Sequence, residues 1–588
     1  MGSAERSEGV EREVKLGAWA GMALPDLADV VAGAGVTSLP PQRLTATYFD
    51  TPDLRLARWG ITVRHRAVET AGASDPGAEL PWTVKLPGPD APTGGLARRE
   101  IGFAGGDRRV PPPVASLVRA LTRTEPLAAV ARLRTERLRL ELHDQTGAPL
   151  AEIDDDEVSV LVGRRLASRF REVEVELASG ADPSVLSAVV KCLRQAGAGR
   201  PDPTPKAIRA LGPRALEPPD VVVPSLSRRA TVAEVVTAAV AASVARLLRH
   251  DPGVRLGDDP EDVHQARVAT RRLRSDLRTF RSLVDEQWAG ALRDELGWIA
   301  GLLGEVRDAD VLHERLGKQV APLPAADAKA ASLLLRRLAD QREVAGEALR
   351  VAMDSPRYAR LLDELVEAAR APVFAPAAVS QPAPGGDDLR HLGPLALRTS
   401  QETQVAKLDG SPASATDAGS APAPTGGANA GDATAAPARA PATATAPTDE
   451  DGPEPRLAVD VLPALVRRPW RHLERAVAEL GPEPTDDALH QVRIRAKRCR
   501  YAAEAAAGVM GKPADRLGEA VADLQTVLGD FHDAVVAEEW LREAAARGPA
   551  SVALVAGELV AAEREEAEAG RQAWKGAWKR ASSKKLRS

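Results

Sequence analysis

The stretch Val10-Glu-Arg-Glu-Val-Lys15 alternates apolar and charged residues near the start of the chain. Alternation with a period of two, carried by branched apolar residues, predicts a β-strand. Side chains two positions apart point to the same side of a strand, so Glu11, Glu13 and Lys15 share one face. Two carboxylates and one ammonium are therefore expected side by side.

The same alternation recurs through about the first 215 residues, with turn-forming stretches such as Pro87-Gly-Pro-Asp90 between the strands. One charged row is commonly the wet face of a sheet. A wet face does not predict so many charged rows in one region. If the sheet closes into a barrel, these faces could all line its lumen. The rows are Arg64 and Arg66, Thr83 and Lys85, Arg98 and Glu100, Arg132 and Arg134, Glu152 with Asp154 and Asp156, and Glu172 with Glu174 and Glu176.

Such a lumen would contain both basic and acidic side chains. Arginine and lysine attract a chain of phosphates, whereas carboxylates repel it. Divalent cations that bridge carboxylates to phosphate oxygens reconcile the two. Magnesium prefers oxygen ligands and fits better than zinc, because the sequence has no cluster of cysteine and histidine.

From Thr231 onward the pattern is helical. Thr231-Val-Ala-Glu234 predicts a capping box, and Asp259-Pro-Glu261 predicts a second helix start. Residues 372–455 interrupt this pattern with alanine, proline, glycine, threonine and serine. A segment of this composition buries too little apolar surface to offset its ordering entropy, which predicts a disordered linker.

The two helical halves contain a repeat. Val263-His-Gln-Ala-Arg-Val-Ala-Thr-Arg-Arg-Leu-Arg274 returns as Leu489-His-Gln-Val-Arg-Ile-Arg-Ala-Lys-Arg-Cys-Arg500. Leu303-Gly-Glu-Val-Arg-Asp-Ala309 returns as Leu528-Gly-Asp-Phe-His-Asp-Ala534. Two matched blocks in the same order, at nearly the same offset, indicate a duplication.

Steps of three and four place basic residues on one stripe of each repeated helix. Like charges four positions apart destabilise a helix by about 0.2–0.5 kcal/mol per pair, so a counter-charge is expected. Asp308 and Asp533 can supply part of it, and a polyanion would supply more. One alternative is that the stripe is a solvated face with salt bridges. Another is that it binds nucleic acid, but aromatic residues that could stack on the bases of a single strand are scarce. The stripes are His264, Arg267, Arg271, Arg274 and Arg278, and His490, Arg493, Lys497 and Arg500; Glu504 stands at the repeat position of Arg278.

The composition excludes several classes of protein. The 588 residues carry a formal net charge of −5, so any anion-binding surface must be local. Cys192 and Cys499 lie far apart, which argues against a disulfide framework and fits a reducing cytosol. No apolar run reaches transmembrane length, and the start lacks a secretory signal. We expect a cytoplasmic protein without a membrane partner.

The helical repeat, with its Leu-Gly-x-x-Arg/His-Asp signature, resembles the CHAD family over about residues 229–585. That resemblance implies a pair of four-helix bundles that bind inorganic polyphosphate, with a place at polyphosphate granules as one consequence. The residues that correspond to the family's basic helices are those of the two stripes apart from Arg278, namely His264, Arg267, Arg271, Arg274, His490, Arg493, Lys497 and Arg500.

The E-x-E-x-K spacing and the later strands resemble the CYTH family of triphosphate tunnel metalloenzymes over about residues 8–212. The resemblance implies an eight-stranded antiparallel tunnel that holds Mg²⁺ or Mn²⁺ and cleaves a phosphoanhydride bond. Lys15 and Glu13 are the implied catalytic pair. The implied substrate ligands are Lys15, Arg64, Arg66, Lys85, Arg98, Arg134, Arg137 and Lys206. The implied metal ligands are Glu11, Glu13, Glu100, Asp154, Asp156, Glu172 and Glu174.

We therefore predict an α+β multidomain protein. Its divisions are a tunnel domain (8–212), a linker (213–228), a first helical half (229–371), a disordered linker (372–455) and a second helical half (456–585). The predicted activity is metal-dependent hydrolysis of a triphosphate, most simply inorganic triphosphate, with polyphosphate bound by the helices. The alternatives are a non-catalytic polyphosphate-binding protein and a cyclase that acts on a nucleoside triphosphate. No phosphate loop of the Walker type is present.

Overall fold

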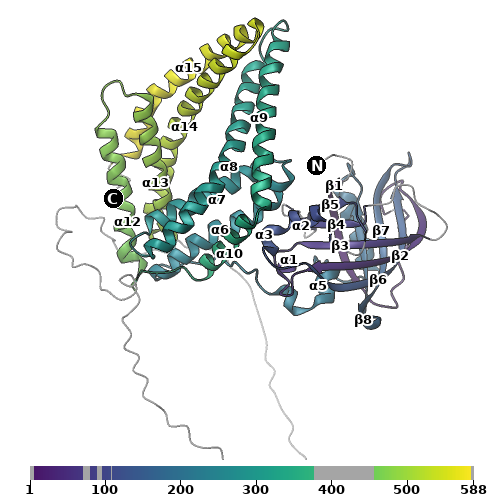
Figure 1. Ribbon diagram of the computed structural model, residues 1–588. Helices are drawn as coiled ribbons and strands as arrows, with labels where there is room; N and C mark the ends of the chain where they lie inside the picture. The colour runs from purple at the N-terminus through teal and green to yellow at the C-terminus, as the bar shows by residue number, and fades with distance from the viewer. Residues whose placement is uncertain are drawn as a thin grey trace, which may run out of the picture.

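The computed structural model describes residues 6–28, 30–70, 80–88, 96–106, 109–375 and 456–583, and their side chains except at 6–11, 70, 96 and 97. A barrel of strands and a set of long helices form two parts that lie side by side (Figure 1). Apart from its first four residues, the predicted linker 372–455 lies outside the described part of the chain.

The N-terminal part is a closed barrel with the strand order β1-β5-β4-β3-β2-β6-β7-β8, and every neighbouring pair is antiparallel. Strand β1 closes it by pairing with both β5 and β8. The predicted fold class is therefore confirmed. The strands are β1 (Arg6–Ala18), β2 (Gly35–Asp50), β3 (Thr62–Thr70), β4 (Trp82–Pro87), β5 (Leu96–Phe103), β6 (Ala128–His143), β7 (Pro149–Val162) and β8 (Arg165–Leu177).

The barrel carries its charge inside and much of its apolar surface outside. On β8, Val173 and Val175 point outward and are fully buried beneath helix α4 (Pro183–Gln195). The alternate positions Glu172 and Glu174 point inward, because side chains of a strand alternate between its two faces. The covering helix thus lets an alternating strand bury its apolar face while the lumen remains polar.

One end of the lumen is apolar. Ala46 of β2, Leu133 of β6 and Val158 of β7 form a buried cluster with Ala207. Ala207 belongs to the short helix α5 (Lys206–Leu211), which follows the barrel strands. Because α5 packs at this end, its first residue, Lys206, reaches the charged part of the lumen.

The C-terminal part is helical on both sides of the linker. The first half has five helices in the described residues and the second has four. The tips of α8–α9 and α14–α15 share one buried cluster (Figure 1). The helices are α6 (Val232–Leu256), α7 (Pro260–Thr279), α8 (Glu286–Val320), α9 (Ala328–Asp354), α10 (Pro356–Arg370), α12 (Ala458–Ala478), α13 (Asp486–Met510), α14 (Lys512–Arg547) and α15 (Ala550–Ala581).

The predicted helix starts are confirmed. Thr231 and Glu234 form the reciprocal capping box of α6, and Asp259 caps α7 ahead of Pro260. The repeated helices are α7 and α13, which contact each other. On both helices, the residues one position before the basic stripe are buried, so the basic stripes beside them lie near the junction of the two halves. The buried stripes are Val263, Ala266, Thr270, Leu273 and Leu277, and Leu489, Val492, Ala496, Cys499 and Ala503.

The two parts share a core. Short helices α1 (Arg55–Arg58), α2 (Pro112–Leu117) and α3 (Arg119–Thr122) lie at one side of the barrel, and α2 and α3 contact α6. Apolar residues of β3, β4 and β5 therefore belong to the same buried cluster as α6 and α7. Within the described residues, no helix is both long enough and apolar enough to cross a bilayer. Both cysteines are free thiols.

Candidate functional site

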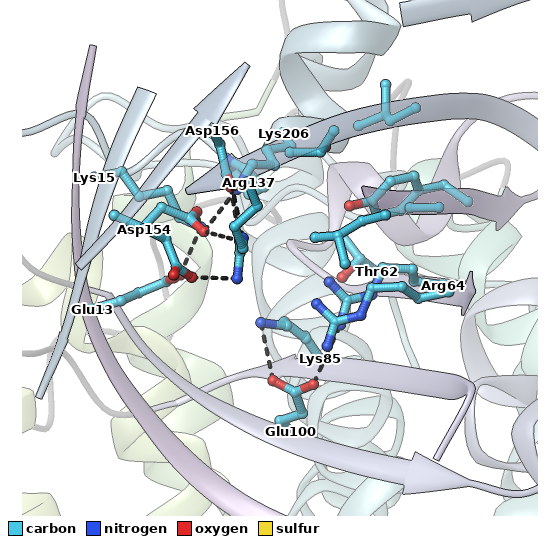
Figure 2. A pocket seen from close by; sticks show the side chains of 18 of the residues that line it. Glu13, Lys15, Thr62, Arg64, Lys85, Glu100, Arg137, Asp154, Asp156 and Lys206 are labelled. Atoms are coloured by element: carbon cyan, nitrogen blue, oxygen red, sulfur yellow. Dashed lines mark hydrogen bonds and ion pairs between the residues drawn. The ribbon is translucent and has the colours of Figure 1, made fainter. Parts of the chain in front are cut away.

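A polar cavity of about 110 Å³ occupies the barrel lumen. Acidic and basic side chains from seven strands and from α5 converge on it (Figure 2). The predicted residues that line it are Glu13, Lys15, Arg64, Arg66, Lys85, Arg98, Glu100, Arg137, Asp154, Asp156, Glu174 and Lys206.

One wall of the lumen is acidic and comes from β1, β7 and β8. The strand register sets Glu174 beside Lys15 on β1 and beside Asp154 on β7. The Lys15 ammonium contacts Glu174 and lies 2.9 Å from a Glu13 oxygen. Burial lowers the Lys15 pKa, but Glu174 and Glu13 outweigh burial and raise it above its ordinary value. Lys15 is therefore a protonated cation held within the acidic wall.

Arg137 and Lys206 complete this wall. The Arg137 guanidinium donates to both Asp156 oxygens at 2.8 and 2.7 Å and lies 3.0 Å from Glu174, while it also contacts Asp154. The Lys206 ammonium lies 2.7 Å from both Asp156 and Glu174. Three cations thus offset only part of the negative charge of a larger group of inward carboxylates (Figure 2).

The pKa values of the buried carboxyl groups in this wall shift in opposite directions. Burial raises the Glu174 pKa, but Lys15, Lys206 and Arg137 together bring it well below its ordinary value. Burial raises the Asp154 pKa to about 8 against the opposing charge of Arg137. Burial likewise raises the Glu172 pKa against Lys206. The wall therefore contains both a firmly ionised carboxylate and carboxyls that ionise with difficulty.

The opposite wall is basic and comes from β3, β4 and β5. Lys85 lies 3.0 Å and Arg64 lies 3.5 Å from Glu100, the acid on this wall (Figure 2). Burial, then the charges of Arg64 and Arg137, lower the Arg66 pKa to about 9. Burial disfavours the charged form of Arg66, and Arg64 and Arg137 add repulsion, so a bound anion would stabilise this wall.

Three predicted residues, Glu172, Glu11 and Arg134, are not among the described residues of the lining. Glu172 is fully buried beside the lumen, 3.1 Å from Lys206 and 3.3 Å from Arg209. Glu11 pairs with Arg98 in the β1–β5 register, and its side chain lies outside the described residues.

The expectation that Arg134 faces the lumen is wrong. Its side chain is exposed on the outer face of β6, whereas Leu133, Thr135 and Arg137 line the cavity. The alternation of the strand explains this, because residues on one face of a strand differ by an even number in sequence position. Arg134 and Arg137 differ by three, and no register shift lies between them.

Several residues at the lumen were not predicted from the sequence. Arg209, which lies next to Glu172, sits one turn after Lys206 on α5, so helical spacing could have indicated it. Tyr48, Thr62 and Thr135 also line the cavity. These side chains are uncharged, so charge alternation did not single them out, although Thr62 shares the face of Arg64 and Arg66.

The lumen offers the oxygen ligands that Mg²⁺ and Mn²⁺ prefer. One Asp154 oxygen and both Glu172 oxygens are buried and accept no hydrogen bond, although cations lie near Glu172. Unsatisfied buried carboxylate oxygens fit an additional hard cation. Among the described side chains, no group of three or more potential ligands is already arranged to hold a metal ion.

The helical part gathers the second predicted set. On α7, Arg267 lies 2.7 Å from Asp308 and Arg271 donates to the Tyr501 hydroxyl at 3.2 Å. On α13, His490 and His532 approach through their Nδ1 atoms at 3.2 Å. The two stripes meet across the α7–α13 contact, where Lys497 is surrounded by arginines.

The pKa of Lys497 reflects both its burial and the positive charge of its neighbours. Burial, then Arg271 and Arg493, lower its pKa to about 7. The expected acidic partners are present, because Arg493 lies 3.9 Å from Asp533 as Arg267 lies near Asp308. They do not remove the excess, so the two stripes together form a positive surface. We call His264, Arg267, Arg271, Arg274, His490, Arg493, Lys497 and Arg500 the histidine surface.

The chain therefore combines a barrel with a charged lumen and a duplicated helical part with a basic surface between its two halves. The CYTH domain model matches residues 10–209 and the CHAD domain model matches residues 238–542. The chain belongs to the CHAD family and has the two-domain CYTH–CHAD architecture.

Known proteins resemble the chain to different extents. Uncharacterized proteins from two strains of Mycobacterium tuberculosis are 30% identical over 548 residues, which cover 88% of this chain and 85% of theirs. PptA from Streptomyces chartreusis is 23% identical with a TM-score of 0.39, over 60% of this chain and 100% of that one. The CHAD domain from Ricinus communis is 22% identical with a TM-score of 0.37, over 60% and 96%.

Proposed function

We propose that the barrel lumen hydrolyses a triphosphate, with inorganic triphosphate as the substrate and Mg²⁺ or Mn²⁺ as the cofactor. The observation that carries this proposal is the meeting of a basic wall and an acidic wall in one lumen. A basic wall alone suits a bound polyanion. The carboxylates opposite it repel a polyanion unless a divalent cation lies between them.

The basic wall is suited to bind the phosphates. Arg64, Arg66 and Lys85 present charge-assisted donors from adjacent strands, and guanidinium groups form paired bonds with phosphate oxygens. Rigid strands fix these donors before the substrate arrives. Donors fixed in this way stabilise the charge that develops during phosphoryl transfer, with little reorganisation.

The acidic wall is suited to hold the metal. The proposed ligands are Glu11, Glu13, Glu100, Asp154, Asp156, Glu172 and Glu174. When bound, the cation would neutralise phosphate charge and orient a water molecule. Lys15 contacts Glu13 and Glu174, so we assign Lys15 to charge stabilisation. Glu13 is the proposed proton acceptor of the catalytic pair.

The shape of the lumen favours a short inorganic substrate. The apolar cluster with Ala207 closes one end, and charged side chains dominate the remaining cavity. A nucleoside would require an apolar or aromatic surface for its base, and Tyr48 is the aromatic residue in the described lining. These features favour inorganic triphosphate over the nucleoside triphosphate that a cyclase requires.

We also propose that the histidine surface binds inorganic polyphosphate. Lys497 and the arginines around it form a row of closely spaced cations, which matches a chain of closely spaced phosphates. Such binding would keep the barrel near a store of phosphoanhydride bonds.

The test measures phosphate release from inorganic triphosphate, ATP and long polyphosphate, with and without Mg²⁺. We expect Mg²⁺-dependent release from triphosphate. Glu172→Gln is expected to lower it by about 10²–10³, the usual effect of losing a preorganised charge. Glu157→Gln is the matched control, because Glu157 lies on the same pair of strands but is exposed on the outer face.

Two results would contradict the proposal. Unchanged Mg²⁺-dependent release by Glu172→Gln would show that the assigned metal site is wrong. Binding of triphosphate and polyphosphate without release of phosphate, with any divalent cation, would support the non-catalytic alternative.

A further inference from the structure

A second basic pocket, of about 210 Å³, lies where the C-terminal end of α7 meets α12 and α13. It uses arginines that are not part of the histidine surface. Among the described residues that line it, none is acidic and none is phenylalanine, tyrosine or tryptophan. The lining is Ser275, Arg278, Thr279, Arg281, Ser282, Leu465, Arg468, Pro469, His472, Arg495 and Arg498.

The internal duplication contains a counterpart of this part of the pocket, in which acidic residues balance the charge of an arginine. Arg272 and Arg498 are equivalent, as are Arg278 and Glu504, at the offset that relates His264 to His490. Arg272 bonds to Asp276 on its own helix and contacts Glu504 across the α7–α13 contact. In this copy, the arginine has two acidic partners.

The other copy has lost both partners. Ala502 occupies the position equivalent to Asp276, and Arg278 occupies the position equivalent to Glu504. Arg498 therefore faces Arg278, whose pKa is lowered by burial and then by Arg498. In the described part of the chain, neither arginine forms an ion pair with a carboxylate.

Neighbouring arginines increase the excess of charge. Arg293 of α8 lies close enough to lower the pKa of Arg278 and of Arg498, and its buried Nε atom has no hydrogen-bond partner. Arg495 donates to Gln491 rather than to an acid. A cluster of like charges without a counter-ion destabilises the fold, so a bound anion would stabilise this junction.

The lining identifies the chemistry of the anion. Guanidinium groups match phosphate oxygens in pairs, and Ser275, Thr279 and Ser282 add hydroxyl donors. Leu465 and Pro469 provide the apolar part of the lining. Among the described lining residues, His472 supplies the one ring, and the lack of phenylalanine, tyrosine and tryptophan disfavours stacking of nucleic acid bases. A pocket of this size suits a short anion rather than a helix of nucleic acid.

We propose that this pocket binds a short inorganic phosphate anion of about diphosphate size. Its lining shares no residue with the barrel lumen or the histidine surface, and Arg278 lies near Arg274 at the end of that surface. Occupation of the pocket would stabilise the junction between the two helical halves. The site does not depend on catalysis in the barrel, so it can be tested whether or not the barrel is active.

The test uses the full chain and inorganic pyrophosphate. Hydrogen exchange of residues 279–285, the turn after α7, reports this pocket and not the lumen. We expect pyrophosphate to slow exchange there in the wild-type protein. Arg278→Glu restores the acid found in the equivalent copy and should allow an ion pair with Arg498, so the fold is preserved. This variant should need at least about tenfold more pyrophosphate for the same protection.

Arg336→Glu on α9 is the matched control, because it makes the same charge change outside the pocket, and it should behave as wild type. Arg498→Ala is a second variant expected to weaken protection. Equal protection in wild type and Arg278→Glu, or none in wild type, would overturn the proposal. So would protection that requires long polyphosphate and disappears in Lys497→Ala, because the pocket would then be an extension of the histidine surface.

Discussion

Arg137 is the residue on which the acidic wall of the lumen depends. Its guanidinium touches Asp154, Asp156 and Glu174, which come from two strands. These acids raise its pKa above the ordinary arginine value, although burial acts in the opposite direction. Removing a partner from a buried charge group costs about 3–5 kcal/mol, so Arg137 contributes to folding as well as to the site.

The first prediction compares Arg137 with its outward neighbour on the same strand. Arg137→Gln should lower triphosphate hydrolysis by about 10²–10³ and also lower the unfolding temperature, because three carboxylates lose their shared cation. Arg134→Gln should leave both unchanged, since that side chain is exposed. Steady-state kinetics and thermal unfolding of both variants check this. An equal loss of activity in the two variants would contradict the assigned facing of β6.

The contact between α7 and α13 concentrates cations that sit far apart in sequence. Lys497 lies among Arg267 and Arg271 of α7 and Arg493 of its own helix, and Asp533 of α14 opposes them only in part. With its pKa at about 7 rather than its ordinary value of 10.5, Lys497 gains its proton as the pH falls through neutrality. The positive charge of the histidine surface therefore increases toward lower pH.

The second prediction concerns this titration. Polyphosphate should bind about tenfold more tightly at pH 6 than at pH 8, because one charge-assisted contact is gained. Lys497→Arg should keep tight binding at pH 8 and lose most of the pH dependence. Fluorescence titration with labelled polyphosphate, at constant salt, measures both. A wild-type affinity that is constant over this range would show that Lys497 does not take part.

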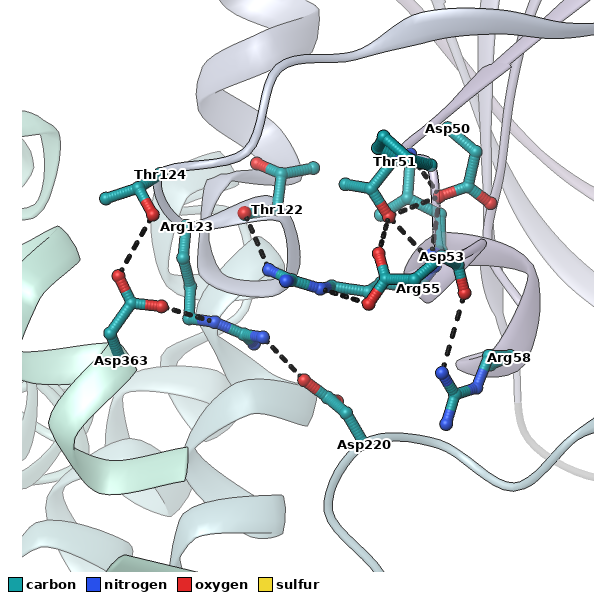
Figure 3. Close-up of polar contacts among 12 residues, drawn as sticks. Asp50, Thr51, Asp53, Arg55, Arg58, Thr122, Arg123, Thr124, Asp220 and Asp363 are labelled. Atoms are coloured by element: carbon teal, nitrogen blue, oxygen red, sulfur yellow. Dashed lines mark hydrogen bonds and ion pairs between the residues drawn. The ribbon is translucent and has the colours of Figure 1, made fainter. Parts of the chain in front are cut away.

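A buried ion pair joins the two parts of the molecule. Arg123, at the end of α3, adopts a positive φ of 55°. Its guanidinium bonds to Asp220 in the segment before α6 and to Asp363 of α10 (Figure 3). The side chains of Arg123 and Asp220 are 3% and 1% exposed, whereas Asp363 is 39% exposed. The barrel and helices are therefore connected by polar contacts as well as by their common core.

The third prediction tests this connection. Asp220→Asn should lower the free energy of unfolding by about 3–5 kcal/mol, because it leaves a buried arginine with one exposed partner. Asp363→Asn should cost at most about 1 kcal/mol, as expected for a more exposed pair. Urea denaturation followed by tryptophan fluorescence distinguishes them. Similar costs for the two variants would mean that Asp220 is not the main partner of Arg123.

The order of strands and helices was predictable because local patterns carry it. Alternation along β1 and β8 marks strands whatever surrounds them, and Thr231 with Glu234 caps α6 through neighbouring atoms. The match between His264 and His490 indicated the duplication before any contact was known. Shared faces within a strand were predictable for the same reason.

The direction in which each face points, and what lies opposite it, depends on tertiary contacts. Closure of the barrel by β1 decides that Glu13 and Lys85 share a lumen, and the phase of β6 turns Arg137 inward and Arg134 outward. Local sequence carries alternation but not the absolute orientation of a strand, because either face can be buried. The same holds for Arg278 and Arg498, whose unbalanced charge follows from the packing of α7 against α13.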